Sequence, residues 1–150
     1  MRITALALAD EPRRFVSGGN PRGARLLLTP NIEISRLAAL VTGIDHLRYL
    51  DERVCTIDLD GTEDLILAHV PLAAERSARR VADHLRNTNI PLLFFGPAVT
   101  AMPEPAPPWM RHRVIGDLLN VWEQVRTDVL SGSLADTYRA DRMPIHSVMA

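Results

Sequence analysis

The chain has 150 residues, of which 47% are hydrophobic and 23% are charged, and its formal net charge is −1. This size and composition predict one folded domain with a sizeable core. The scattered arginines argue against the concentrated basic face that binds nucleic acid without sequence preference, but they do not exclude a small local basic patch. No apolar run approaches the roughly 20 residues that span a bilayer.

The start of the chain and its cysteine content predict the compartment. A short apolar run in residues 1–9 is followed by acidic residues, without a secretory cleavage pattern. The single cysteine, Cys55, excludes an internal disulfide and any iron–sulfur cluster held by several cysteines of this chain. We therefore expect a cytoplasmic protein that carries no iron–sulfur cluster and is not bound to a membrane.

The first third of the chain predicts a strand, a loop and a helix. Residues 2–9 form an apolar run suited to a buried strand, which ends at Asp10. Residues 11–23 contain two glycines in succession and two prolines, and so predict a loop. Residues 24–30 fit either a second strand or an extended lead-in. Helical spacing then follows at Ile34, Leu37, Val41 and Ile44, with Gly43 placed to end the helix.

The middle of the chain predicts two strands and a helix. Residues 46–54 alternate in polarity and have an acidic end, whereas residues 64–70 are apolar after the first position, as in a strand covered on both faces. Pro71 is predicted to open a helix. The inward stripe of that helix is Ala74, Ala78, Val81 and Leu85.

The last third predicts two strands, a rigid connector and a final helix. Residues 90–95 and 111–116 are the strands, and four prolines lie between Met102 and Trp109 in the connector. Asp117 is predicted to cap the final helix, which the segment 131–133 stops. The inward residues of that helix are Leu118, Val121, Val125 and Val129.

Strands that alternate with amphipathic helices predict an α/β fold. We expect a single flavodoxin-like, or Rossmann-like, three-layer domain over residues 1–140, with a five-stranded and mostly parallel sheet. Residues 141–150 are expected to form a C-terminal tail.

In such a sheet, ligands bind beyond the carboxyl ends of the strands. Small residues stand at three predicted strand ends, namely Ala68, Gly96 and Gly116. They would let a bulky planar ligand approach the backbone closely. The alternative is that the glycines at strand ends only make turns.

Several kinds of site are not supported by the sequence. The segment "SGGNPRG" lacks the spacing of a P-loop, no G-x-G-x-x-G occurs, and the chain has no lysine. The five histidines show no metal-ligand spacing, and only His69 stands near the expected ligand edge. Cys55 has no neighbour in the sequence that would activate it as a nucleophile.

Three segments together resemble the N-terminal cobalamin-binding domain of cobalamin-dependent radical SAM enzymes, in particular the hopanoid-methylase-like branch. "ISRLAALVTGIDHLRYLDERVCTID" is similar to that family's first helix, second strand and acidic "DE-x-V" segment. "DLILAHVPLAAERSARRVADHLRNTNIPLLFFGPAVTAMPE" is similar to its third strand, its next helix and the "GGPHxTxxPEE" turn. "VIGDLLNVWEQVRTDVLSGSLADTYRA" is similar to its closing "VxGExE-x-xW…D…G-x-L…Y" pattern.

The resemblance implies cobalamin as cofactor, with the turn 96–104 beside the nucleotide tail of the ligand. The cofactor-binding residues expected from the resemblance and from the strand ends are Ala68, His69, Phe95, Gly96, Pro97, Ala98, Thr100, Gly116 and Asp117. The motif D-x-H-x-x-G of corrinoid proteins that ligate cobalt through histidine is absent. The resemblance therefore implies no histidine from that motif below the metal.

The sequence departs from the family at the proposed site and in length. Phe95 stands where the family has glycine, Ala98 where it has histidine, and Leu119 where it has a second acid. The family continues into a barrel with a CxxxCxxC motif, whereas this chain stops at Ala150. With one cysteine, it cannot hold the cluster or cleave S-adenosylmethionine alone.

The leading hypothesis is therefore a corrinoid carrier, or an accessory subunit to a radical SAM or other corrinoid enzyme. A degenerate domain without ligand, acting as an interaction scaffold, is the first alternative, and a light or redox sensor is another. A small enzyme using Asp10, Glu11 or His69 is the last. Met102, Trp109 and Met110 are expected to form an apolar rim suited to self-association, and Gly96→Val to abolish corrinoid binding while the fold survives.

Overall fold

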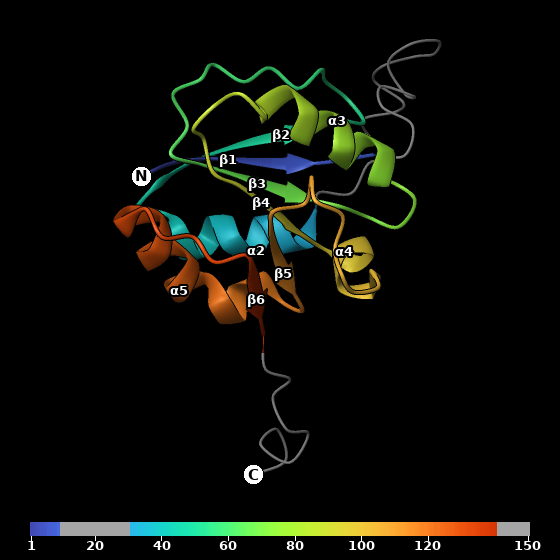
Figure 1. Cartoon of the computed structure of the whole chain (residues 1–150). Coiled ribbons are helices and arrows are strands. Elements are labelled where there is room, and N and C mark those ends of the chain that lie inside the picture. The colour runs from blue at the N-terminus through green and yellow to red at the C-terminus, as the bar shows by residue number, and fades with distance from the viewer. Residues whose placement is uncertain (10–30, 141–150) are drawn as a thin grey trace.

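The protein, described here in a computed structural model for residues 1–9 and 31–140, is built on one six-stranded sheet (Figure 1). All neighbouring strands are parallel, and their order is β2-β1-β3-β4-β5-β6. The strands are β1 (Arg2–Ala7), β2 (His46–Asp51), β3 (Leu65–His69), β4 (Leu92–Phe95), β5 (His112–Ile115) and β6 (Thr137–Arg139). The flavodoxin-like α/β fold is confirmed, with one strand more than the five expected.

Four helices connect the strands of the described part: α2 (Ile32–Val41), α3 (Glu75–Leu85), α4 (Pro97–Ala101) and α5 (Leu118–Ser131). Two of them begin with the side-chain caps that their sequences favour. The Asn31 side chain accepts a hydrogen bond from the Ile34 N–H, and that of Asp117 accepts one from the Leu119 N–H, both at 3.0 Å.

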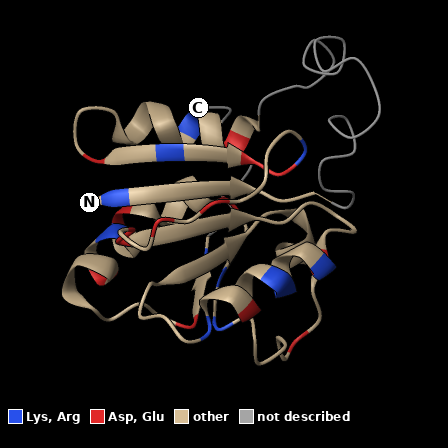
Figure 2. Ribbon diagram, turned by 90° about the horizontal axis from the view of Figure 1, so that it is seen from above, with Lys and Arg blue, Asp and Glu red and all other residues tan. Residues whose placement is uncertain are grey.

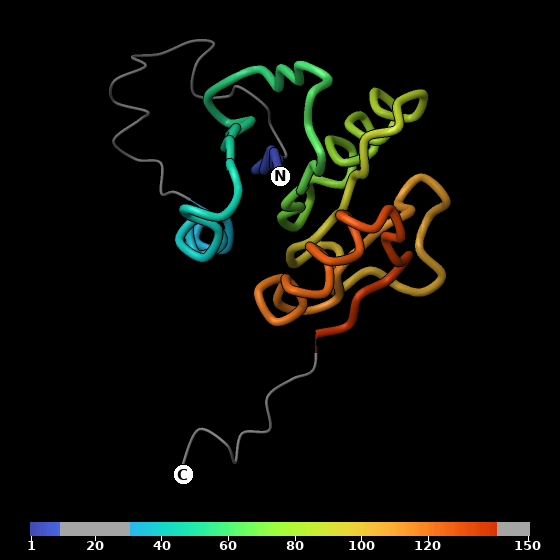
Figure 3. Tube along the Cα trace, turned by 90° about the vertical axis from the view of Figure 1, so that its left-hand side faces the viewer, coloured from blue at the N-terminus to red at the C-terminus, as the bar shows by residue number. Residues whose placement is uncertain are grey.

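The helices divide between the two faces of the sheet and form two cores, a division visible in the end-on view of Figure 3. The first core lies under α2 and α5, which bury Leu37 and Trp122 against the sheet. The second lies under α3 and α4, which contribute Ala78 and Val99. Side chains of successive strand residues alternate between these cores, because a strand has a period of two.

Two details of the predicted helices were wrong. Pro71 does not open α3, because its carbonyl accepts a hydrogen bond from the Ala74 N–H (3.1 Å) in a turn where Ala73 has φ +69°. The helix therefore begins four residues later, at Glu75. Ile44 does not continue the inward stripe of α2, since the helix ends at Val41, and Ile44 is 67% exposed.

The sixth strand is anchored by one aromatic side chain. Tyr138 is buried, its hydroxyl donates to Asp128 Oδ2 (2.6 Å), and that hydroxyl accepts from the Ala135 N–H (2.9 Å). Burial, followed by the hydrogen bond to Asp128, raises the pKa of Tyr138 to about 12. The three-residue strand therefore depends on a contact with α5, which cannot be predicted from the short sequence of the strand.

The proline-rich segment after α4 is fastened to the sheet through its acidic residue. The carboxylate of Glu104 accepts a hydrogen bond from Arg139 on β6 and lies 3.3 Å from Arg113 Nη2 on β5. Arg113 is almost completely buried, so Glu104 supplies the countercharge that a buried guanidinium requires. The segment thus acts as a cover over the edge of the second core.

The apolar residues of this segment face inward more than expected. The Trp109 ring meets the Phe94 ring edge-on at 5.7 Å, and Met102 packs against the same core. Met110 is only 3% exposed, so the expectation that it forms an exposed apolar rim is wrong.

None of the helices in the described part of the chain combines the length and apolar character needed to cross a membrane.

Candidate functional site

The order of the strands places the candidate site at the carboxyl ends of β1 and β3. From β1 the chain passes through α2 to β2 on one side, and then returns to β3 on the other side of β1. The crevice at such a reversal is where open α/β sheets bind ligands. Asp10 and Glu11, the acids expected at this edge, lie outside the described residues.

The imidazole of His69 occupies the space beside Gly96. A Cβ atom added to Gly96 would lie 3.1 Å from the His69 ring and 2.9 Å from the Val70 carbonyl oxygen. The same ring packs edge-on against the Phe95 ring, with 5.3 Å between the two ring centroids. His69 is 8% exposed, and its burial lowers the pKa of the imidazole. A neutral imidazole, held in place by aromatic and backbone contacts, therefore lies at the end of β3.

The first turn of α2 brings a carboxyl group to the same place. Glu33 Oε2 lies 3.8 Å from His69 Nε2, too far for a hydrogen bond, and it has no hydrogen-bond partner among the described residues although the atom is buried. Burial, then the charge of Asp117, raises the pKa of Glu33, and Arg36 opposes this shift. An unsatisfied acceptor of this kind is unusual in a folded protein and indicates a place where a ligand donor would be favourable.

The opposite side of this site is formed by the beginning of α5. Asp117 caps the helix through one oxygen, while its other oxygen lies 3.4 Å from Arg36 Nη1 on α2. The first turns of two helices therefore present an acid and an arginine beside Glu33. Their approach is a consequence of α2 and α5 packing side by side on one face of the sheet.

Replacing Glu33 with glutamine is expected to change how stability depends on pH. Because the folded state raises the pKa of Glu33 above its ordinary value of 4.5, the folded wild type should lose stability as the pH rises through that value and through the folded pKa. Glu33→Gln removes this loss, so its advantage over the wild type should grow across the same interval. Urea denaturation at a series of pH values measures this difference. A difference that stays constant with pH would contradict the result.

The end of β2 carries a second polar cluster, visible as the charged segments that follow the outermost strand in Figure 2. Asp51 accepts hydrogen bonds from Arg53 Nη2 (2.6 Å) and from the Tyr49 hydroxyl (3.1 Å). Burial opposes ionisation of Asp51, but its several hydrogen bonds with Arg53 prevail and lower its pKa. The cluster therefore holds a carboxylate at the margin of the site.

The neighbouring acid, Glu52, points to the other face and has a structural role. Its Oε1 accepts hydrogen bonds from the Ala9 N–H (3.0 Å) and from the Ser77 hydroxyl, and Arg80 Nη2 lies 3.9 Å away. Glu52 is 7% exposed. It joins the exit of β1 to α3.

The nine expected cofactor-binding residues do not form one surface. His69, Gly96 and Phe95 lie together, and Asp117 lies near Glu33, all on the α2 and α5 side. The side chain of Ala68 is buried in the core beneath α3, and Ala98 packs against that core. Thr100 Oγ1 accepts a hydrogen bond from the Gly116 N–H (3.0 Å), so these two residues tie α4 to the end of β5. Pro97 is the first residue of α4.

The geometry offers a polar ligand an acceptor at Glu33, but no open face at either glycine. Glu33 Oε2 could accept a hydrogen bond from a ligand amide. In contrast, the faces of both glycines are covered by the protein: Gly96 by His69, and Gly116 by Ala140, whose Cβ would lie 3.0 Å from an added Cβ. A ligand that contacts Gly96 directly would require the imidazole to move.

The residues missed by sequence reasoning are Glu33, Arg36 and the Asp51–Arg53 pair. Glu33 and Arg36 flank apolar positions of a predicted helix and resemble ordinary solvent-facing residues. The acidic end of the strand before Arg53 was the one available signal. No group of three or more histidine, cysteine, aspartate or glutamate residues is arranged to hold a metal ion within residues 1–9 and 31–140.

Comparisons with known proteins add no further constraint on this site. Neither a family model, nor a curated protein, nor a solved structure matches the chain.

Proposed function

We propose that this protein is a corrinoid-binding domain that serves as a carrier, or as an accessory subunit to a radical SAM or other corrinoid enzyme. The resemblance of three segments to a cobalamin-binding domain motivates the ligand. The observation that carries the proposal is the unsatisfied, buried Glu33 oxygen beside His69, at the reversal of strand order. Corrinoid amides are hydrogen-bond donors suited to such an acceptor. When bound, cobalamin would supply the chemistry of its cobalt, while this chain would bind and orient it.

The proposal is tested by titrating the protein with hydroxocobalamin, removing free ligand by desalting, and recording the ultraviolet–visible spectrum. We expect corrinoid absorbance to remain with the protein and Glu33→Ala to weaken binding by about tenfold, which corresponds to about 1.4 kcal/mol. Glu123→Ala, on the exposed side of α5, is the matched control and should bind like the wild type. Absence of corrinoid absorbance from the desalted wild type would refute the proposal.

A second function is favoured by the covered glycines. If the contacts of His69 with Gly96 and of Ala140 with Gly116 are permanent, the domain has kept the fold without the ligand and acts as an interaction scaffold. His69→Ala separates the two functions. In a carrier, this substitution opens the space beside Gly96 and should strengthen corrinoid binding, whereas in a scaffold neither the wild type nor the variant should bind.

A further inference from the structure

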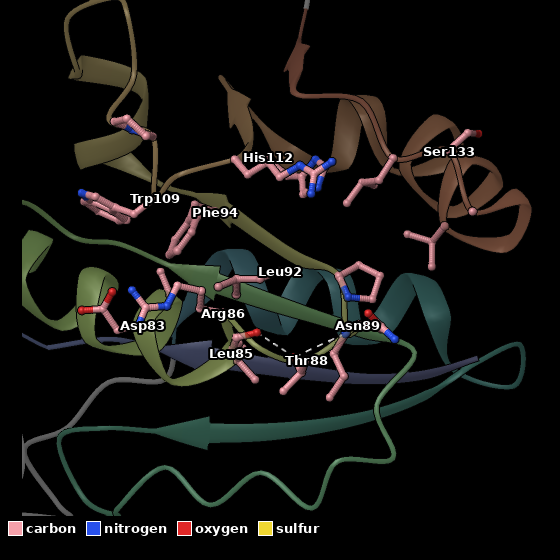
Figure 4. Close-up of a pocket in the computed structure, with 18 residues that line it drawn as sticks. Asp83, Leu85, Arg86, Thr88, Asn89, Leu92, Phe94, Trp109, His112 and Ser133 are labelled. Carbon is pink, nitrogen blue, oxygen red and sulfur yellow. Dashed lines mark hydrogen bonds between the residues drawn. The ribbon is translucent and has the colours of Figure 1, made fainter.

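A groove of about 620 Å³ lies at the amino ends of β4 and β5, whereas the proposed corrinoid site lies at the carboxyl ends of β1 and β3. One wall is the last turn of α3 with the beginning of β4, and the other is the beginning of β5 with the end of α5 (Figure 4). Its volume is within the range of about 300–1,000 Å³ that is usual for small-molecule sites. The function proposed above makes no use of it.

Part of the groove lining is apolar. Leu85, Leu92, Leu134 and Phe94 contribute to its lining, with Trp109 at one end. The edge-on contact of Trp109 with Phe94 holds the indole in position. Because Phe94 and Leu85 are already buried, an apolar group bound here would gain affinity mainly from its own removal from water.

The rim of the groove carries more positive than negative charge. Arg86 stands on the α3 wall and Arg111 on the β5 wall, and neither forms an ion pair with any residue that the structure describes. Asp83 is the one acidic residue in the lining. Guanidinium groups without a partner favour a carboxylate or a similar oxyanion, which they bind through two parallel hydrogen bonds.

Several other polar groups at the rim form hydrogen bonds within the protein. His112 Nδ1 lies 2.9 Å from the Ala135 carbonyl oxygen, so the proton of a neutral ring is on Nδ1 and Nε2 is an acceptor. One terminal carbonyl of each helix is hydrogen-bonded, since Leu85 O accepts from Thr88 Oγ1 (2.8 Å) and Val129 O accepts from the Gly132 N–H (3.1 Å). The carboxyl ends of α3 and α5 bring the negative ends of two helix dipoles to the groove, and the positive charges of Arg86 and Arg111 offset them.

We propose that this groove is a second binding site, which takes an amphipathic organic anion. The apolar body of the ligand lies in the groove beside Trp109, and its carboxylate or sulfonate lies at the rim, where Arg86 and Arg111 both attract it. The proposal goes beyond the corrinoid function and does not depend on it, because the two sites lie at opposite ends of the strands.

The experiment uses the fluorescent probe 8-anilinonaphthalene-1-sulfonate, which has both an aromatic body and a sulfonate. We expect saturable binding to the folded full chain, competition by dodecanoate, and weakening by about tenfold in Arg86→Gln and in Arg111→Gln, the effect of losing one charge-assisted contact. Arg79→Gln, an exposed arginine of α3 outside the groove lining, is the matched control and should leave binding unchanged. Amide shifts in the nuclear magnetic resonance spectrum should locate the probe near Thr88 and Ser133.

Three results would overturn this assignment. The first is equal probe binding by the wild type and both groove variants, when circular dichroism shows that all are folded. The second is an equal loss in Arg79→Gln, which would show a general charge effect. The third is binding of an acidic peptide, such as penta-glutamate, at the same amides without competition by dodecanoate, which would assign the groove to a protein partner instead.

Discussion

Gly96→Ala is expected to lower the free energy of unfolding by about 2–4 kcal/mol. Two effects add at this position. The backbone has φ +111° and ψ −178°, a region that essentially only glycine adopts. In addition, the new Cβ would lie 2.9 Å from the Val70 carbonyl oxygen, which belongs to the backbone and cannot turn away as a flexible side chain would. Urea denaturation followed by circular dichroism measures the loss.

Gly61→Ala is the matched control for this prediction. Gly61 also has positive φ, +82°, but a Cβ there would meet no atom within 4 Å. Its expected cost is therefore the backbone term alone, about 1 kcal/mol. Equal losses at the two positions would show that the contact between Gly96 and the end of β3 relaxes freely.

This result also changes the meaning of the Gly96→Val experiment. The sequence suggested that the valine would exclude the corrinoid while the fold survived. The contact of Gly96 with β3 instead predicts that a branched side chain would disturb the sheet itself. Loss of ligand in that variant would therefore not locate the ligand, and Glu33→Ala and His69→Ala are the more informative substitutions.

The central elements of the fold could be predicted because the local sequence of each one is enough to indicate a strand or a helix. β4 is continuously apolar and β3 is apolar up to His69, as expected of strands buried on both faces, and each lies between two paired strands. The inward stripes of α2 and α5 follow the helical period, with Leu37 and Val125 fully buried. Strands, helices and their alternation together determine the flavodoxin-like class.

The elements at the margin could not be predicted, because their stability comes from tertiary contacts. β6 has three residues and depends on the hydrogen bonds of Tyr138 with α5 and with Ala135. α4 has five residues and begins at Pro97 directly after β4, in a segment whose prolines indicate a loop. Periodicity cannot identify elements shorter than about two turns or four strand residues.

The sequence indicated the carboxyl ends of the strands as the place for a site, but it did not indicate all the residues that lie there. His69 was singled out because it ends a strand, a property that can be read from local sequence. Glu33 acquires its role only when the first turn of α2 packs beside β3, and its raised pKa follows from that burial. The ring of Phe95, which stands where the family has glycine, is buried in the core beneath α2 and α5, a position that the local sequence does not distinguish from the ligand site.

That burial gives the second large effect. Phe95→Ala is expected to lower the free energy of unfolding by about 3–5 kcal/mol, the usual cost of deleting a buried phenyl ring and leaving a cavity. The ring is 0% exposed, and His69 rests against it edge-on. Phe95→Leu should cost less, because leucine refills most of the volume with an apolar group. Urea denaturation of both variants measures the difference.

The same pair of variants relates stability to the position of His69. If the Phe95 ring holds the imidazole over Gly96, Phe95→Leu should loosen it while the domain stays folded, and the imidazole resonances in the nuclear magnetic resonance spectrum should shift. A carrier should then bind hydroxocobalamin more tightly in Phe95→Leu than in the wild type, because displacing the imidazole costs less. A loss below about 1 kcal/mol for Phe95→Ala would contradict the packing described here, since a ring so easily removed cannot hold its neighbour in place.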